Sequence, residues 1–110
     1  MATGRLGVTA LAATTNTTVY TVPAGYYTIA NVSITNRGTN AVTIRLAMST
    51  SGGGTPSPNA EEWIEYDTII IPNGVFERTG LVLNYGLNLI VYSSATNVGC
   101  TVYGIETSTS

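Results

Sequence analysis

Histidine and lysine are both absent from this 110-residue sequence. The absence of histidine removes the commonest general base and the usual zinc ligand, and it excludes Ser/His/Asp and Cys/His nucleophile arrangements. The absence of lysine removes Schiff-base chemistry and the phosphate-binding loop, so we interpret the glycine run at residues 52–54 as linker. We therefore expect no enzymatic activity, with no catalytic residues, no metal and no cofactor.

Charge is scarce as well, since only 9% of the residues are charged, against about 25% in an ordinary globular protein. The cations form no basic run, which argues against nucleic-acid binding. They are Arg5, Arg37, Arg45 and Arg78. A hydrophobic content of 44% with a net charge of only -2 argues against disorder. The composition predicts a folded chain whose weakly charged surface is partly covered by association.

The single cysteine, Cys100, lies in the apolar alternation Val98, Cys100, Val102 and is predicted to be a small core side chain. One cysteine cannot form an internal disulfide. The N-terminal stretch has neither a basic n-region nor an apolar h-region, and the longest apolar runs are too short to span a membrane. We expect a protein that is made in a cytoplasm and does not enter a membrane.

The sequence is rich in β-branched residues, threonine among them, which favour strands. It is also rich in asparagine and glycine, which favour turns. Strands are expected over residues 6–12, 17–22, 27–35, 41–49, 63–71, 75–83, 87–93 and 98–105. About eight short strands separated by turns predict one all-β domain over residues 1–110, an antiparallel β-sandwich of jelly-roll-like form. In the fourth strand, alternation places Val42, Ile44, Leu46 and Met48 on the face that packs.

Two turns that contain proline and glycine are expected at residues 23–25 and 72–74, each as a type I turn closed by a glycine bulge. The second would form a hairpin in which Ile71 pairs with Val75.

Two segments are expected to lie outside the packed strands or at their edge. Residues 50–60 have the composition of a flexible exposed loop, either slack chain or an arm that orders on a partner, and we favour slack. Residues 1–13 are interpreted as an N-terminal arm or an edge strand.

Acidic residues gather between positions 61 and 67. Glu65 and Asp67 are two residues apart on one predicted strand and are expected to share a face. Such a pair can hydrolyse glycosides when a cleft holds it, and carboxylates can bind calcium. A chain of this size leaves little room for a cleft, and no EF-hand spacing is present. We favour ion pairs between these carboxylates and arginines, within or between subunits.

Seven tyrosines, Trp63 and Phe76 can supply stacking platforms for sugars or anchors for a protein partner, although most are expected to fill the core. Tyr26 and Tyr27 are adjacent on a predicted strand, so one of these two rings must point away from the core. The residues taken together as a candidate interface are Arg5, Tyr26, Tyr27, Arg45, Trp63, Glu65, Asp67 and Arg78.

Three segments, residues 16–50, 64–83 and 93–106, together resemble a group of small β-sandwich virion proteins of tailed bacteriophages. The shared pattern combines VYTVPAG, a strand of the VTIRLA type, an EYDT element and a closing VYGIE. The resemblance implies a structural protein of the virion, synthesised in the host cytoplasm, and it supplies no catalytic residues.

Two placements in the virion remain open. The first is a capsid decoration or cement protein that stabilises the shell as a homo-oligomer, with a trimer favoured, against the major capsid protein or other virion proteins. The alternative is a tail or fibre module that binds host-surface carbohydrate. Size favours decoration, because the sequence contains neither coiled-coil heptads nor a long fibrous repeat.

Overall fold

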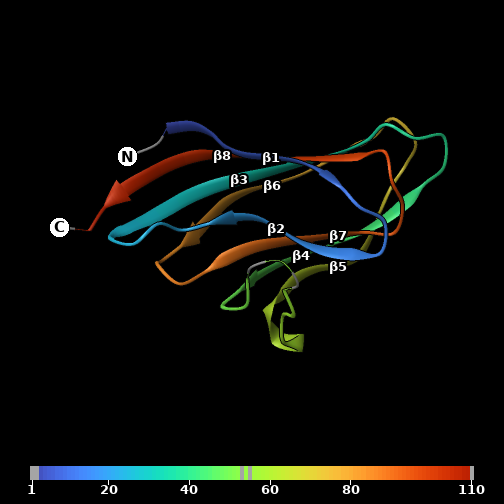
Figure 1. Ribbon diagram of the computed structural model, residues 1–110. Helices are drawn as coiled ribbons and strands as arrows, with labels where there is room; N and C mark the ends of the chain where they lie inside the picture. Colours follow the sequence, from blue (N-terminus) through green and yellow to red (C-terminus); the bar gives the residue numbers. More distant parts are fainter. Residues whose placement is uncertain (1–2, 53, 55, 110) are drawn as a thin grey trace.

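The computed structural model describes residues 3–52, 54 and 56–109 of the chain. These residues form eight strands in two four-stranded sheets that lie face to face (Figure 1). The strands are β1 (Thr3–Leu11), β2 (Thr15–Thr21), β3 (Tyr26–Asn36), β4 (Val42–Ser49), β5 (Trp63–Ile70), β6 (Val75–Leu83), β7 (Asn88–Ser93) and β8 (Val98–Ser108). A 3-10 turn, η1 (Ala60–Glu62), precedes β5. Within the described ranges, no helix has the length and apolar character that crossing a membrane requires.

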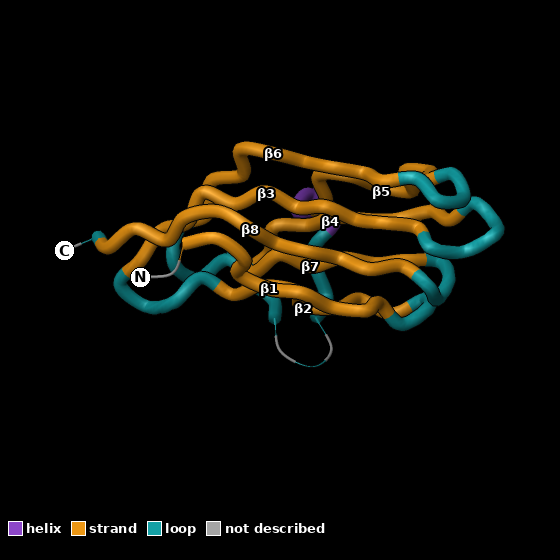
Figure 2. Tube along the Cα trace, turned by 90° about the horizontal axis from the view of Figure 1, so that it is seen from above, coloured by secondary structure: helices purple, strands orange, loops and turns teal. Residues whose placement is uncertain are grey.

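The strand order identifies the fold. Sheet A has the order β1-β8-β3-β6, and sheet B has the order β2-β7-β4-β5. Every connection crosses from one sheet to the other except that between β4 and β5, which are neighbours in sheet B. Figure 2 shows the two stacked sheets, with β1 and β2 along one edge and β5 and β6 along the other. This is the order of a jelly roll, so the expected antiparallel sandwich of eight strands is confirmed.

The core between the sheets is aliphatic. Each predicted strand segment overlaps one observed strand, and the ends differ by a few residues. Val42, Ile44 and Leu46 point into the core as their alternation predicts. Cys100 is also a core residue, as predicted, and burial raises the pKa of its thiol to about 12.

A cluster of three buried polar side chains ties the two sheets together within this core. The Tyr20 hydroxyl on β2 donates a hydrogen bond to Glu106 Oε2 on β8 (2.6 Å) and lies 2.8 Å from Thr28 Oγ1 on β3. All three residues are buried. Burial, together with the bond to Glu106, raises the pKa of Tyr20 to about 12.

The hairpin predicted at residues 72–74 is wrong. β5 pairs with β4 in sheet B, whereas β6 pairs with β3 in sheet A. The turn between them closes with a hydrogen bond from Gly74 N to Ile71 O (2.9 Å), and Asn73 rather than Gly74 takes the left-handed conformation, with φ 61°. The turn therefore leads the chain from one sheet to the other. The same turn residues are compatible with a hairpin, so they do not distinguish the two arrangements.

The loop that joins β4 to β5 lies on the outer side of sheet B, as Figures 1 and 2 show. It contains residues 50–60, of which 53 and 55 lie outside the described residues. Pro56 is buried, and its carbonyl accepts a hydrogen bond from Asn16 Nδ2 on β2 (3.3 Å). Ala47 and Ile90 pair with each other on β4 and β7 and are fully buried without joining the core between the sheets.

The base of this loop is closed by Glu62. Its Oε1 accepts hydrogen bonds from Ser49 Oγ (2.6 Å) and from Asn59 N (2.8 Å). The bond from Ser49 is the main cause that lowers the pKa of Glu62. Because the carboxylate joins both ends of the loop, it holds η1 beside the end of β4.

Candidate functional site

A β-bulge in β5 shapes the outer face of sheet B. The register between β4 and β5 shifts around Arg45, so this residue faces two residues of β5, Tyr66 and Asp67. Asp67 has a left-handed φ of 55°, a conformation that Asp adopts more readily than most residues. A regular strand would point Tyr66 and Asp67 to opposite faces. The bulge instead brings both side chains to Arg45.

Arg45 is held on three sides. Its Nε donates to Asp67 Oδ1 at 2.7 Å, and this bond is the main cause that raises the pKa of Arg45. Its guanidinium carbon lies over the Tyr66 ring at 4.1 Å from the centroid and over the Tyr92 ring at 4.6 Å. Tyr92 is the direct partner of Arg45 in the register between β4 and β7. The cation is therefore ordered by a charged hydrogen bond and by two cation–π contacts.

Trp63 extends this group toward the loop. Its ring meets Tyr66 edge-on, with centroids 5.7 Å apart and an interplanar angle of 73°. Ala60, Trp63 and Tyr66 line an open pocket of about 340 Å³. We call Arg45, Trp63, Tyr66 and Tyr92 the aromatic face.

A second ion pair closes the open side of the sandwich. Arg78 Nη1 on β6 donates to Glu65 Oε2 on β5, and Thr68 Oγ1 donates to Glu65 Oε1 (2.9 Å). β5 and β6 are edge strands of different sheets, so the pair joins sheet B to sheet A. Together with the Asp67 pair, it confirms the predicted use of these carboxylates in arginine pairs.

The expectation that Glu65 and Asp67 share a face is wrong. Glu65 pairs with Leu46, whose side chain is fully buried in the core, so Glu65 belongs to the inner face at the sheet edge. Asp67 contacts Arg45 on the outer face. The bulge between them breaks the two-residue alternation from which the shared face was predicted.

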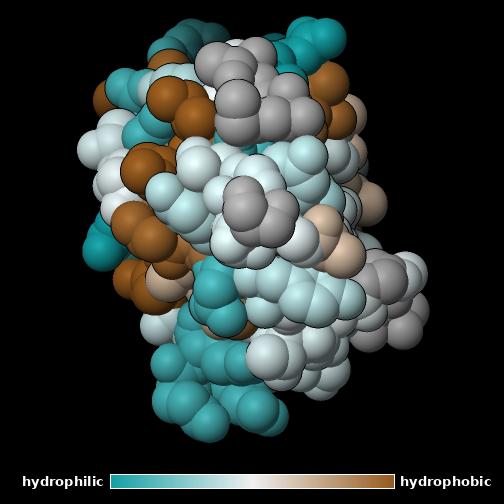
Figure 3. Space-filling view, turned by 90° about the vertical axis from the view of Figure 1, so that its left-hand side faces the viewer, coloured by the Kyte–Doolittle hydropathy of each residue, from teal (hydrophilic) through white to brown (hydrophobic). Residues whose placement is uncertain are grey.

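The outer face of sheet A carries an uncovered apolar row. Ile105, Ile29 and Val82 pair across β8, β3 and β6, and they are 49%, 44% and 63% exposed. We call these three residues the apolar row. Tyr27, two residues before Ile29 on β3, is also exposed. The end of the molecule that carries both termini, seen in Figure 3, shows apolar surface beside side chains that range from weakly polar to strongly hydrophilic.

Polar residues of the candidate interface border this row. Arg5 is exposed on β1, which is the edge strand of sheet A, and it pairs with Tyr103 of β8. The Tyr103 hydroxyl donates to Glu77 Oε2 (3.2 Å), and this bond is the main cause that raises the pKa of Tyr103. Tyr26 packs against the core while Tyr27 is exposed, as their adjacency requires.

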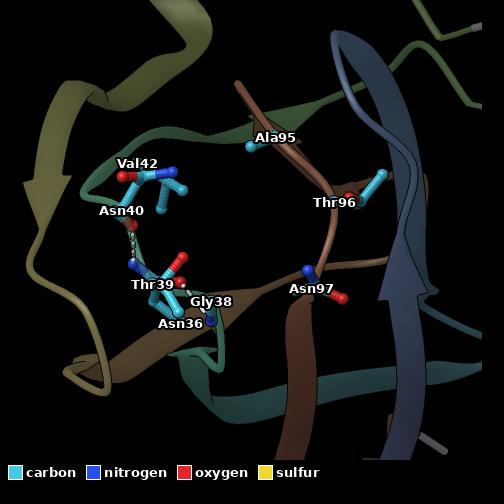
Figure 4. A pocket seen from close by; sticks show the side chains of 8 residues that line it. All are labelled: Asn36, Gly38, Thr39, Asn40, Val42, Ala95, Thr96 and Asn97. Carbon is cyan, nitrogen blue, oxygen red and sulfur yellow. Dashed lines mark hydrogen bonds between the residues drawn. The ribbon is translucent and has the colours of Figure 1, made fainter.

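A further pocket of about 180 Å³ lies between the β3–β4 and β7–β8 loops (Figure 4), at the end of the sandwich opposite the termini. Asn36 forms part of its wall and is fully buried. Its Nδ2 donates to Asn40 O (2.9 Å) and Ile70 O (3.2 Å), and its Oδ1 accepts from Gly38 N (2.9 Å). The Asn36 amide is thus bonded to the surrounding backbone and holds the loop in place. We therefore assign this pocket a structural role rather than a binding role.

The structure separates the predicted interface residues into three places. Arg45, Trp63 and Asp67 meet in or beside the aromatic face. Glu65 and Arg78 pair at the open edge. The remaining three residues, which lie on β1 and β3 of sheet A, are Arg5, Tyr26 and Tyr27.

Tyr66 and Tyr92 were not singled out from the sequence, although each contacts Arg45. The available signal was only that both are tyrosines on predicted strands. Their meeting with Arg45 depends on the bulge and on a register that joins strands 47 residues apart in sequence, at Arg45 and Tyr92.

Within residues 3–52, 54 and 56–109, no group of three or more His, Cys, Asp or Glu side chains is placed to hold a metal ion. Comparison of the chain with protein-family models, with curated proteins and with solved structures finds no match.

Proposed function

We propose that this chain is a non-enzymatic structural protein of a tailed-phage virion that decorates or cements the capsid as a homo-oligomer. Its partners are the major capsid protein or other virion proteins, and a trimer is the expected oligomer. The proposal is supported by the resemblance of residues 16–50, 64–83 and 93–106 to small virion proteins, and by the apolar row on sheet A.

The apolar row is the observation that carries the proposal. Its three side chains lie next to one another on a sheet, yet each is between 44% and 63% exposed. Apolar side chains that gather on an exposed face favour a protein contact. The centres of protein interfaces are also poor in charged residues. This chain has only 9% charged residues overall. Association would remove the row from water.

The architecture agrees with a shell protein. Jelly rolls occur in viral capsid and lectin domains. This likeness concerns the fold and does not by itself determine function. It does provide what a decoration protein needs, which is a rigid sandwich that presents two broad outer faces to its neighbours.

Ile29→Glu tests the proposed association. Light scattering coupled to size-exclusion chromatography should give a trimer for the unmodified chain and a monomer for Ile29→Glu. The reason is that an unpaired carboxylate at a buried contact costs at least about 2 kcal/mol. Ile71→Glu is the matched control, because Ile71 is 67% exposed but lies outside the strands of sheet A, and this variant should remain trimeric.

Two outcomes would contradict the proposed association. A monomer for the unmodified chain at high concentration would show that the chain does not self-associate. An unchanged oligomer for Ile29→Glu would show that the apolar row is not the contact.

Placement on the capsid needs a separate experiment. Purified chain is mixed with particles of the encoding phage from which this protein has been stripped, and bound protein is located by electron microscopy. We expect rebinding at regular positions on the shell, weakened by Ile29→Glu and retained by Ile71→Glu. Binding confined to the tail would overturn the decoration role.

A further inference from the structure

The aromatic face lies on sheet B, whereas the apolar row lies on sheet A, so the two surfaces are presented by opposite layers of the sandwich. Trp63 and Tyr66 line a pocket beside the arginine that Tyr66 and Tyr92 sandwich. We propose that the aromatic face binds a neutral oligosaccharide of pyranose sugars. This inference does not depend on the proposed virion function.

The exposed ring of Tyr66 provides the surface on which a sugar can stack. Tyr66 is 57% exposed, although its ring contacts both Arg45 and Trp63. A pyranose ring presents a face of C–H groups that packs on the electron-rich face of an aromatic ring. Its hydroxyl groups then require polar partners at the edge of the stack. Asp67, with a side chain that is 49% exposed, and the tyrosine hydroxyls supply such partners.

The site is also organised before any ligand arrives. Arg45 is fixed by Asp67 and by the rings of Tyr66 and Tyr92, and Trp63 supports Tyr66 from its edge. A ligand therefore does not have to order a long flexible side chain when it binds. Preorganisation of this kind lowers the entropic cost of association.

The charge of the site favours a neutral ligand. Arg45 is already paired with Asp67 at 2.7 Å, so the pair has no net charge to offer an ionic group. The chain as a whole carries a net charge of -2, which opposes the approach of a polyanion. A neutral glycan meets neither obstacle.

The shape of the site favours a small ligand over the surface of another protein. The loop between β4 and β5 and η1 project from the outer side of sheet B (Figure 1), and Ala60 of η1 borders the pocket. The pocket, of about 340 Å³, is within the lower part of the range of ordinary ligand sites. Trp63 and Tyr66 therefore lie beside a projecting loop. A narrow chain of sugars can reach them there more easily than the flat surface of another protein can.

Trp63 provides a direct reporter, because it is the only tryptophan in the sequence. Its fluorescence is followed while the unmodified chain is titrated with cellohexaose, maltohexaose or hexa-N-acetylchitohexaose, all neutral pyranose oligomers. At least one of them should change the emission saturably, with half-saturation below about 10 mM. Oligogalacturonate of similar length serves as the charged comparison and should bind more weakly.

Variants of Tyr66 test whether stacking causes the change. Tyr66→Ala should weaken binding about tenfold or more, while Tyr66→Phe keeps the ring and should retain most of the affinity. Tyr85→Ala is the matched control, because Tyr85 is 62% exposed but lies in the turn between β6 and β7, and its loss should change nothing. Circular dichroism checks that each variant is folded.

Three results would overturn the proposal: no saturable change with any of the three neutral oligomers, binding that survives Tyr66→Ala, or tighter binding of oligogalacturonate. Ile29→Glu separates this result from the association proposed above. It should bind the neutral oligomer as the unmodified chain does, since Ile29 is on sheet A. The experiments can therefore show that one proposal fails while the other still holds.

Discussion

At the scale of single residues, the buried Tyr20–Glu106 contact shows how a polar group is accommodated in an otherwise aliphatic core. The Tyr20 hydroxyl and Glu106 Oε2 are 2.6 Å apart, and Thr28 Oγ1 lies on the other side of the hydroxyl. No buried side-chain nitrogen or oxygen in the described residues lacks a hydrogen-bond partner. A buried carboxylate is tolerated under these conditions because its hydrogen bonds offset part of the cost of leaving water.

Replacing Tyr20 tests this contact. Tyr20→Phe should lower the free energy of unfolding by about 1–3 kcal/mol at pH 8, because it removes a donor to a buried carboxylate. The folded-state pKa of Tyr20, about 12, lies above its ordinary value of 10.0. The stability linked to this proton is therefore fully present below pH 10 and is lost as the pH rises through about 12.

Urea unfolding of both proteins at several pH values measures the effect. The difference between the unmodified chain and Tyr20→Phe should be constant below pH 10 and should shrink as the pH approaches 12. A difference that stays constant up to pH 12 would contradict the raised pKa of Tyr20 as a contributor to stability.

At the scale of elements, the bulge in β5 converts an edge strand into part of a surface site. Without the extra residue, Asp67 would point away from the face that carries Tyr66. With it, Asp67 in the left-handed conformation reaches Arg45, and Tyr66 stacks on the same guanidinium. Bulges also bend edge strands and so hinder the pairing of sheets from different molecules.

Two substitutions at Asp67 separate its conformation from its charge. Asp67→Asn should cost less than about 1 kcal/mol, because the ion pair is partly exposed and Asn also tolerates a positive φ. Asp67→Val should cost about 1–2 kcal/mol more, because a β-branched residue is strained at φ 55°. Urea denaturation measures both, and equal losses would mean that the conformation at Asp67 contributes nothing.

At the scale of the whole molecule, the two outer faces of the sandwich have different characters. Sheet A presents the apolar row, and sheet B presents an arginine surrounded by aromatic rings. The few charges of the chain are largely used within it, in the two salt bridges and in the contact between Tyr103 and Glu77. Surfaces of this kind leave apolar contact as the main means of association.

The response to salt follows from this distribution. If the oligomer forms through the apolar row, raising sodium chloride from about 0.1 M to about 1 M should not dissociate it, because screening acts on charges rather than on apolar contacts. Sedimentation velocity at the two salt concentrations gives the measurement. Dissociation at high salt would assign the contact to ionic groups such as Arg5 and Glu77 instead.

Much of the fold can be read from the sequence. Alternating residues such as Val42, Ile44 and Leu46 mark a strand and its buried face, because the period of two in a strand is a local property. Turn residues mark where strands end, and all eight strands were found in this way. Cys100 was placed in the core by the same alternation.

The tertiary structure decided which strands pair and which side chains meet. The sequence between Ile71 and Val75 determines a turn, but whether it makes a hairpin or a crossing between sheets depends on where β4 and β3 lie. The aromatic face likewise exists only because β7, β4 and β5 are neighbours in sheet B and because a bulge rotates Asp67 toward Arg45. Local residue patterns determine strands and turns by short-range sterics and burial, whereas pairing between distant strands follows from packing of the whole core.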